Sequence, residues 1–322
     1  MCIRDSVQSH YQKIGWNGKW IAIGGSYAGN LSAFYSVLYP KQLVGALSSS
    51  APVIAKNDFI EYDAHIHKVA GPKCVADILF VTKEVEKNLG SDFRRLKKLF
   101  AAESIIRKTD FMYVIADISA AAVQYGYKDD FCQAISGSNK VEAYANFGKK
   151  LFKIWGTGAE GFSFQSAEPT SLNKHSKGIG MRQWIYQSCT EYGYWQNAHP
   201  DVNKRSRSTL INLKYHQSVC KRLFGIDKLA DTKAFNKIWY TALKLIKSNA
   251  PVIMTNGLED PWLTLSITPD TIKKSGPFPS LLSYSIKKGA HCDDLRINKI
   301  KSNQSTKFVF TLTNKIFKSW VQ

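Results

Sequence analysis

One serine stands in a setting that could make it a nucleophile. Ser26 occupies the centre of the run GGSYAG, which follows the apolar segment Ile21–Ile23 and precedes apolar residues at helical spacing up to Leu38. This pattern predicts a buried strand, a sharp turn and a helix that ends before Pro40, the order found in a nucleophile elbow. A serine held in such a turn would project its hydroxyl above the sheet, where it could attack a carbonyl carbon.

Small residues around Ser26 are consistent with so sharp a turn. Gly24 and Ala28 leave room where larger side chains would clash. The amide N–H of Tyr27 would point to the same space as the serine oxygen and could supply half of an oxyanion hole. The pattern G-x-S-x-[GA] also occurs by chance, and a Gly-Ser turn before a helix is more often only a turn. The interpretation therefore needs a base and an acid elsewhere in the chain.

An acid and a histidine follow in the order that an elbow fold uses, which is serine, acid, histidine. Asp260 comes just after the predicted strand 250–255, and His291 comes just after the predicted strand 281–286. Of the seven histidines, His291 alone follows Asp260. Because the carboxyl ends of parallel strands meet at one edge of a sheet, we expect the three side chains to meet there. Ser26 would attack, His291 would accept its proton, and Asp260 would hold the imidazole.

Other acids and serines compete for these roles. The rival acids are Glu259, Asp293 and Asp294. Strand alternation would point Glu259 away from the histidine, and the other two acids are too near it in sequence. The serines at 48–50 could be nominated as nucleophiles, but no elbow or following helix supports them, so we expect ordinary strand-end serines.

The composition indicates a globular chain with a basic surface. The 322 residues are 44% hydrophobic, and 44 basic against 25 acidic residues give a formal charge of +19. The basic residues are spread out and no nucleic-acid-binding motif accompanies them, so we expect a solvated surface and no nucleic-acid partner. No apolar run reaches transmembrane length, and no membrane partner is expected. The first six residues, MCIRDS, resemble translated adapter sequence and are left out of the fold argument.

The pattern of elements divides the chain into three segments. Residues 7–56 and 248–322 carry the strand-like runs and predict an α/β core with a parallel sheet, while residues 57–247 predict a mostly helical insertion. A closing helix is predicted over Lys307–Trp320. The helices predicted within the insertion are Val75–Leu89, Phe93–Phe100, Phe111–Tyr125, Val141–Ile154, Leu210–Leu223 and Thr232–Ile246.

Two stretches of the insertion could bind a ligand. Asp63, His65 and His67 could be drawn as a metal site, and alternation along a strand would place both histidines on one face. No third ligand on that face is indicated, so we expect neither metal nor cofactor. Residues 156–176 are rich in Gly, Ser and Thr and predict a loop. The run 182–196 that follows is dense in aromatic residues and is either a packed core or the wall of a substrate pocket. The candidate pocket residues are Trp184, Tyr186, Glu191 and, beyond the insertion, Trp262.

Five motifs in order resemble one family. GGSYAG, LYPKQLVGALSSSAPV, WIYQSCTEYGYWQ, NGLEDPW and GAHCDDL resemble the prolyl carboxypeptidase family of serine peptidases, which includes dipeptidyl peptidase II and the thymus-specific serine peptidase. The resemblance runs from about Lys19 to the end. It implies an α/β-hydrolase core with a helical cap, and Ser26, Asp260 and His291 as a triad. It also implies a secreted or lysosomal setting and cleavage after proline in short peptides, since a compact ring suits a closed apolar pocket.

The cysteines leave two interpretations open on their spacing alone. Six are present, five once the second residue is set aside, and they could form two disulfides or remain buried and free. The resemblance implies that Cys74 pairs with Cys132 and ties neighbouring cap segments together. We expect Cys189 and Cys220 as the second pair, partly by elimination, and Cys292 as a free thiol.

The chain departs from the family pattern in two ways. Ser26 lies almost at the start, whereas several strands normally precede an elbow, so we expect an incomplete hydrolase core whose first strands and second oxyanion donor are missing. Such a chain alone should show an open sheet edge, poor solubility and no useful activity. Ile185 stands where some dipeptide-releasing relatives carry an acid, which leaves recognition of a substrate amino terminus open.

Together these features predict a serine exopeptidase that cleaves short peptides, after proline, through an acyl-enzyme. An esterase or lipase with the same triad is the first alternative, and a non-catalytic binding protein on a hydrolase scaffold is the second. The sequence does not distinguish carboxypeptidase from aminopeptidase action. We expect a short peptide as the partner, with a homodimer also open.

Overall fold

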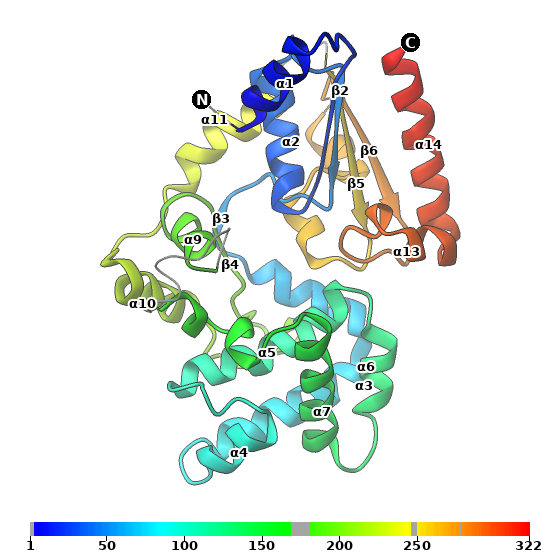
Figure 1. The fold of residues 1–322 in the computed structure, drawn as a ribbon. Coiled ribbons are helices and arrows are strands. Elements are labelled where there is room, and N and C mark those ends of the chain that lie inside the picture. Colours follow the sequence, from blue (N-terminus) through cyan, green and yellow to red (C-terminus); the bar gives the residue numbers. More distant parts are fainter. Residues whose placement is uncertain (1–2, 169–180, 246–249, 277) are drawn as a thin grey trace.

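Figure 1 shows a parallel sheet flanked by helices and, beyond one end of it, a group of helices. The structure is a computed structural model and describes residues 3–168, 181–245, 250–276 and 278–322. Both chain ends lie on the sheet part, at the end farther from the helical group. The predicted α/β class with a helical cap is therefore confirmed.

Four parallel strands form the main sheet, in the order β1-β2-β5-β6. They are β1 (Ile21–Gly25), β2 (Gly45–Ser49), β5 (Val252–Gly257) and β6 (Leu281–Ile286). Their carboxyl ends are aligned, since Gly25 is opposite Ser49 and Ser49 is opposite Thr255. The turns that follow β1, β5 and β6 therefore open at the same edge, as the sequence predicts.

Helices cover both faces of this sheet (Figure 1). α2 (Tyr27–Leu38) and α11 (Thr232–Leu245) pack on one face, and α14 (Gln304–Val321) runs along the other. Phe34 of α2 contacts Trp239 of α11, with ring centroids 5.0 Å apart. α11 lies in the part of the chain assigned from sequence to the insertion, yet its apolar side packs with the sheet.

β1 forms one edge of the sheet. Among the residues that the structure describes, β1 pairs with β2 alone, and Ile23 is 56% exposed. An edge strand presents unpaired N–H and C=O groups to any strand that reaches it. The sheet edge that the sequence predicts to be open is therefore open in the described part of the chain.

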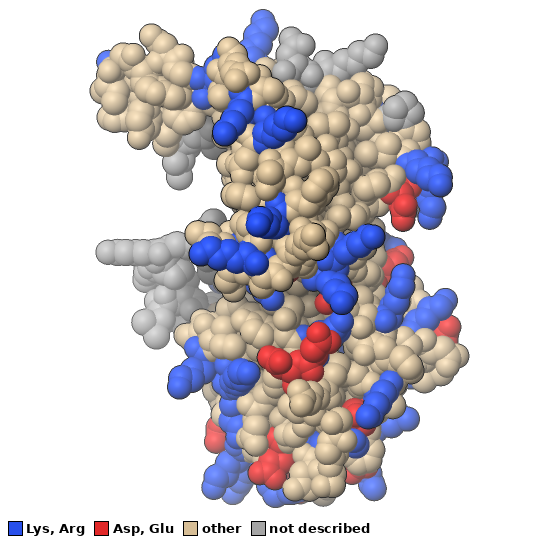
Figure 2. All heavy atoms as spheres, turned by 90° about the vertical axis from the view of Figure 1, so that its right-hand side faces the viewer, with Lys and Arg blue, Asp and Glu red and all other residues tan. Residues whose placement is uncertain are grey.

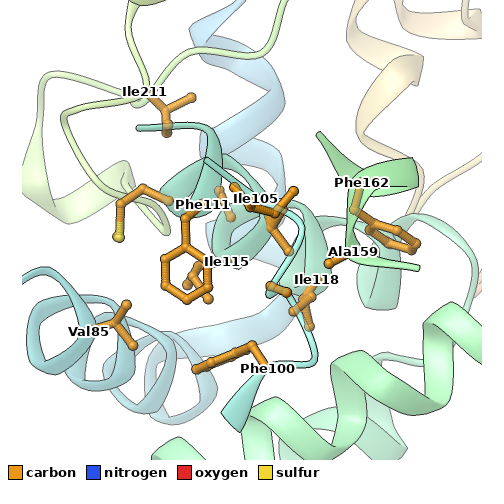
Figure 3. Packing of buried hydrophobic residues seen from close by; sticks show 14 of the residues in the cluster. Val85, Phe100, Ile105, Phe111, Ile115, Ile118, Ala159, Phe162 and Ile211 are labelled. Carbon is orange, nitrogen blue, oxygen red and sulfur yellow. The ribbon is translucent and has the colours of Figure 1, made fainter. Parts of the chain in front are cut away.

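The helical group has its own apolar core. It is built from α3 (Ile60–Lys87), α4 (Phe93–Leu99), α5 (Lys108–Gln124), α6 (Lys128–Ala134), α7 (Lys140–Ile154), α9 (Met181–Gln187) and α10 (Leu213–Phe224). Figure 3 shows Phe111 and Ile115 of α5 packed with Val85 of α3 and with Phe100. From residue 110 to residue 124, α5 is buried except at two positions, Tyr113 and Asp117.

The helices predicted in the insertion are present, with shifted ends and some additions. The predicted helix Val75–Leu89 is the second half of α3, which begins at Ile60 and bends at Gly71 (φ 78°, ψ 165°). The sequence analysis did not predict α6, nor the short parallel pair of β3 (Lys56–Asp58) with β4 (Gly193–Trp195). Each of these elements is too short to show a clear period.

The remaining elements are short or terminal. They are α1 (Ile3–Lys13), η1 (Ala159–Phe162), η2 (Phe164–Ala167), η3 (Ser188–Tyr192), η4 (Val202–Lys204), η5 (Pro261–Leu265), α12 (Pro269–Ser275), η6 (Asp293–Leu295) and α13 (Ile297–Ser302). α14 is the predicted closing helix. Parts of two predicted elements lie outside the described residues. These parts are positions 169–176 of the predicted loop and position 246 of the last predicted cap helix.

Both expected disulfides are present. Cys74 on α3 pairs with Cys132 on α6, and Cys189 pairs with Cys220 on α10. Cys292 is free, as expected. Each bond joins two elements of the cap, so both restrict the unfolded chain around the helical core.

The structure also bears on three other possibilities raised by the sequence, namely nucleic-acid binding, a membrane span and a metal site. On the face in Figure 2, basic side chains are scattered over both parts of the molecule. No helix among the described residues is long and apolar enough to cross a membrane. Asp63, His65 and His67 lie on helix α3, not on a strand, and no group of potential metal ligands forms among the described residues. Asp63 instead accepts the amide of Ser206 (2.9 Å) and pairs with Arg207 (3.4 Å).

His216 is buried in the helical core, where its ring is neutral. It is fully buried on α10, it stacks on Trp195 with ring centroids 5.0 Å apart, and its Nδ1–H donates to Asn197 Oδ1 (2.7 Å). Burial, with the nearby charge of Arg207, lowers the pKa of His216 to about 3. In the unfolded chain the ring takes up a proton near its ordinary pKa of about 6.5.

This difference in the pKa of His216 predicts that the protein loses stability at acid pH. Between the two pKa values the ring of His216 is protonated in the unfolded chain and neutral in the folded chain. The free energy of unfolding therefore falls as the pH drops from about 6.5 towards 3. At about pH 4.5 the loss from His216 alone should be about 2–3 kcal/mol relative to pH 7.5. Urea unfolding at the two pH values should therefore show a weaker pH dependence in His216→Gln than in the wild type.

The same change at His10, which lies exposed on α1, is the matched control and should keep the wild-type pH dependence. Equal pH dependence in wild type and His216→Gln would contradict a neutral buried His216.

Candidate active site

Ser26 stands at the turn between β1 and α2 in a conformation that side-chain-bearing residues rarely adopt. Its φ is 57° and its ψ is −128°. The Ser26 amide donates to the carbonyl of Ser49 on β2 (2.8 Å), which fixes the turn against the sheet. A Cβ on Gly24 would lie 2.1 Å from the carbonyl oxygen of Ala28, so the predicted need for a small residue at Gly24 is confirmed.

The amide of Tyr27 is positioned by the start of α2. Because Tyr27 is the first residue of this helix, no carbonyl inside the helix can accept its N–H. The amino-terminal end of a helix also favours negative charge. Both properties suit an N–H that would donate to an oxyanion formed next to Ser26.

His291 and Asp260 form a buried pair. His291 Nδ1–H donates to Asp260 Oδ2 (2.7 Å), and the two residues are 4% and 0% exposed. The second oxygen of Asp260 accepts the amide of Trp262 (3.0 Å), and the amide of His291 donates to the carbonyl of Gln124 on α5 (2.8 Å). These contacts fix the imidazole with Nε2 directed away from the acid, as a general base requires.

The acid controls the protonation of the ring. Burial disfavours a charged imidazole, but the adjacent carboxylate of Asp260 outweighs it and raises the pKa of His291 above its usual range. The pair therefore stabilises the imidazolium that forms when the ring accepts a proton.

The rival acids have other partners. Glu259 accepts from Lys128 on α6 (2.9 Å), which draws it away from the histidine. Asp293 accepts the amide of Ala290 (2.7 Å). Asp294 accepts from the hydroxyls of Ser49 (2.5 Å) and Thr255 (2.6 Å), and so links the loop after β6 to β2 and β5.

The serines at the end of β2 also have structural roles. The hydroxyl of Ser48 donates to the carbonyl of Gly29 on α2 (2.8 Å). The hydroxyl of Ser50 accepts the amide of Cys292 (2.9 Å), and Ser49 bonds Asp294 as above. These contacts support the expectation that the serines at 48–50 are strand-end residues that hold neighbouring loops.

The serine and histidine loops meet through their neighbours. A Cβ on Gly25 would lie 2.9 Å from the Sγ of Cys292, so the residue before Ser26 packs against the residue after His291. Among the described residues, Ser26 Oγ makes no hydrogen bond to His291. The Ser26–His291 contact therefore stays a prediction, whereas Asp260 and His291 are in contact.

A cavity of about 440 Å³ opens at Ser26, between the sheet and the helical cap. We call it the Ser26 pocket. The wall residues used below are Tyr62, Asp117, Gln124, Trp184 and Trp262. Its volume lies in the range of small-molecule sites.

Two of the four candidate pocket residues line this cavity and two do not. Trp184 and Trp262 are in its wall. Tyr186, the second residue after Trp184 on α9, points outward, is 50% exposed and packs on Phe224. Glu191 lines a separate hollow beside α2 and α11. A stretch that is aromatic throughout does not reveal which of its residues face inward.

The pocket also contains residues that the sequence analysis missed. Gln124 accepts from Tyr62 Oη (2.6 Å) and Trp262 Nε1 (2.9 Å) while its carbonyl holds His291. Asp117 is the one charged residue between positions 111 and 127, and this isolated acid in an apolar helix was the available signal. Ile185 is 2% exposed and lines the pocket, so no acid enters the pocket at that position.

Comparisons with known proteins agree with this geometry. The chain is 33% identical over 254 residues to the probable serine protease EDA2 of Arabidopsis thaliana, a match that covers 77% of this chain and 50% of the relative. It is 27% identical over 308 residues to the human thymus-specific serine protease, covering 86% of this chain and 58% of the relative. It is 25% identical over 332 residues to the bovine lysosomal Pro-X carboxypeptidase, covering 94% and 63%.

The chain thus spans between about half and two thirds of the length of these curated relatives. The sequence profile described as serine carboxypeptidase S28 matches residues 3–310, almost the whole chain. The motifs quoted from the sequence contain the Ser26 turn and the Asp260–His291 pair described above. The chain therefore belongs to the serine carboxypeptidase S28 family of peptidases.

Proposed function

We propose that this chain carries the catalytic triad of a serine exopeptidase, with Ser26 as nucleophile, His291 as base and Asp260 as the orienting acid. The observation that carries the proposal is the buried hydrogen bond between His291 Nδ1 and Asp260 Oδ2 (2.7 Å), at the sheet edge where Ser26 occupies a strained turn. An isolated binding scaffold has no need for this combination.

The proposed reaction proceeds in two halves. Ser26 Oγ attacks the substrate carbonyl while His291 Nε2 takes its proton, and the amide of Tyr27 donates to the oxyanion. The imidazolium, stabilised by Asp260, then gives the proton to the leaving amine, which leaves an acyl group on Ser26. Water attacks the acyl group with His291 again as base, and the free serine is regenerated.

The proposed substrate is a short peptide cut after proline. A cavity of about 440 Å³ accommodates a few residues and not a folded protein. Trp184 and Trp262 present apolar rings in its wall, which suit the compact ring of proline. The bovine relative, named a lysosomal Pro-X carboxypeptidase, supports the same preference.

We also propose a secreted or lysosomal setting. The two disulfides favour an oxidising compartment, and the bovine relative is named as lysosomal. The homodimer stays a prediction that sedimentation would check.

A fluorophosphonate probe tests the triad directly. In a protein that contains residues 7–322, we expect the probe to attach to Ser26 and Ser26→Ala to abolish labelling. Peptide mapping by mass spectrometry identifies the labelled residue. Ser136→Ala, at an exposed cap position, is the matched control and should label as the wild type does. A folded protein that labels elsewhere, or not at all, would overturn the proposed function.

A substrate panel separates peptidase from esterase. Hydrolysis of Xaa-Pro peptides should exceed that of p-nitrophenyl esters of acyl chains if the pocket favours proline. The prediction fails if the esters are turned over and the peptides are not.

The pH dependence of labelling should report His291. Only the neutral imidazole can accept the serine proton, so labelling should slow as the pH falls through the pKa of His291. Because Asp260 raises this pKa, the midpoint should lie above the ordinary histidine value of about 6.5.

In Asp260→Asn the carboxylate is lost and burial then lowers the pKa of His291. The midpoint should therefore move to lower pH, and the maximal rate should fall by about 10⁴-fold because the ring is held in the wrong tautomer. A midpoint that stays where it is in Asp260→Asn would show that Asp260 does not act on this ring.

A further inference from the structure

The walls of the Ser26 pocket are uncharged with one exception. Its described lining consists of aromatic, aliphatic, hydroxyl and amide residues, and Asp117 is the one ionisable acid among them, with no Lys, Arg or His. An acid in such a wall is a candidate for recognition of a positively charged group, because a carboxylate binds a cation most strongly where water is scarce.

Helical geometry places Asp117 in this wall. Tyr113, Asp117, Ala121 and Gln124 recur along one side of α5 and all line the pocket. Tyr113 and Asp117 are the two positions of this stretch that are not fully buried, and both line the cavity, although Tyr113 also packs against the cap core.

The carboxyl group of Asp117 has no partner among the residues that the structure describes. Within the described residues it accepts no hydrogen bond and forms no ion pair, whereas the neighbouring acid on α5, Asp110, binds both Tyr215 (2.7 Å) and Arg222 (3.3 Å). Arg207, whose positive charge acts on Asp117, already donates to the carbonyl of Gln196 (2.7 Å) and pairs with Asp63. Burial accordingly raises the pKa of Asp117 to about 6, although Arg207 opposes the rise.

The position of Asp117 along α5 indicates how far it lies from the proposed reaction centre. Gln124 holds the amide of His291 through its carbonyl, and Asp117 lies seven residues earlier, roughly 10 Å along the helix axis. Two or three extended peptide residues span about 7–10 Å. A group bound at Asp117 would therefore lie two or three residues from the bond that Ser26 attacks.

We propose that Asp117 binds an ammonium or guanidinium group of the substrate peptide and so selects peptides that carry a positive charge two or three residues before the scissile bond. This deepens the proposed function and rests on it. The free amino terminus of a short peptide is one source of that cation, and a lysine or arginine side chain is the other. Where the cation is the free amino terminus, the cut would release two or three residues from that end of the peptide.

Binding of three blocked dipeptides tests the site without requiring catalysis. The probes are Ala-Pro-amide, N-acetyl-Ala-Pro-amide and N-acetyl-Lys-Pro-amide, titrated at pH 7.5 against the protein used for labelling. The fluorescence of the tryptophans in the pocket wall, which include Trp184 and Trp262, provides the signal. Wild-type protein should bind at least one of the two cationic probes about 10-fold more tightly than N-acetyl-Ala-Pro-amide.

Asp117→Asn should bring the three affinities to within about 2-fold, because the amide keeps the shape of the side chain and loses its charge. Asp129→Asn is the matched control, since this cap acid has a side chain 96% exposed, and it should keep the wild-type preference. Thermal unfolding checks the fold of the variant. Removing an unpaired buried carboxylate should leave the Tm of Asp117→Asn equal to or above that of the wild type.

The outcomes separate this proposal from the triad. An Asp117-dependent preference for Ala-Pro-amide supports the site and identifies the amino terminus as the cation, and one for N-acetyl-Lys-Pro-amide supports it with a basic side chain as the cation. Equal binding of all three probes, or a preference that persists in Asp117→Asn, overturns it. If the preference holds while Ser26 fails to label, the catalytic proposal fails and the cation site stands. If Ser26 labels and no preference is seen, the cation site fails and the catalytic proposal stands.

Discussion

The hydrogen bond between Asp260 and His291 is the interaction on which the rest of the site depends. Asp260 is fully buried, and a buried carboxylate is tolerated only when its oxygens have partners. His291 and the amide of Trp262 supply them. Breaking such a pair by removing one member costs about 3–5 kcal/mol, because the other is left buried and uncompensated. The loops after β5 and β6 are therefore held to each other as well as to the sheet.

The cap takes part in this geometry through α5. The carbonyl of Gln124, at the last turn of that helix, holds the amide of His291, and its side chain accepts from Tyr62 and Trp262. The helical insertion thus positions the histidine and shapes the pocket at the same time. Gln124, which bonds His291, and Asp117 lie along the same side of α5, so the proposed chemistry and the proposed substrate selection would share one helix.

Much of this arrangement could be predicted from the sequence because it is local or ordered along the chain. The Ser26 turn follows from small residues between a strand and a helix, and Asp260 and His291 follow from their places after two strands. Other features depend on contacts between distant segments. Gln124 has no local signature, since its role requires a loop 167 residues later, and Tyr186 differs from Trp184 only in the side of α9 that it occupies.

The central claim is that Ser26, His291 and Asp260 work as one unit, and a covalent complex tests it most directly. A crystal structure of the complete protein reacted with a proline-containing phosphonate should show phosphorus bonded to Ser26 Oγ, with the phosphoryl oxygen accepting from the amide of Tyr27. The Nε2 of His291 should lie about 3 Å from the oxygens on phosphorus, with Asp260 still bonded to Nδ1. Attachment at another residue, or an imidazole more than about 6 Å from the adduct in an intact loop, would contradict the account.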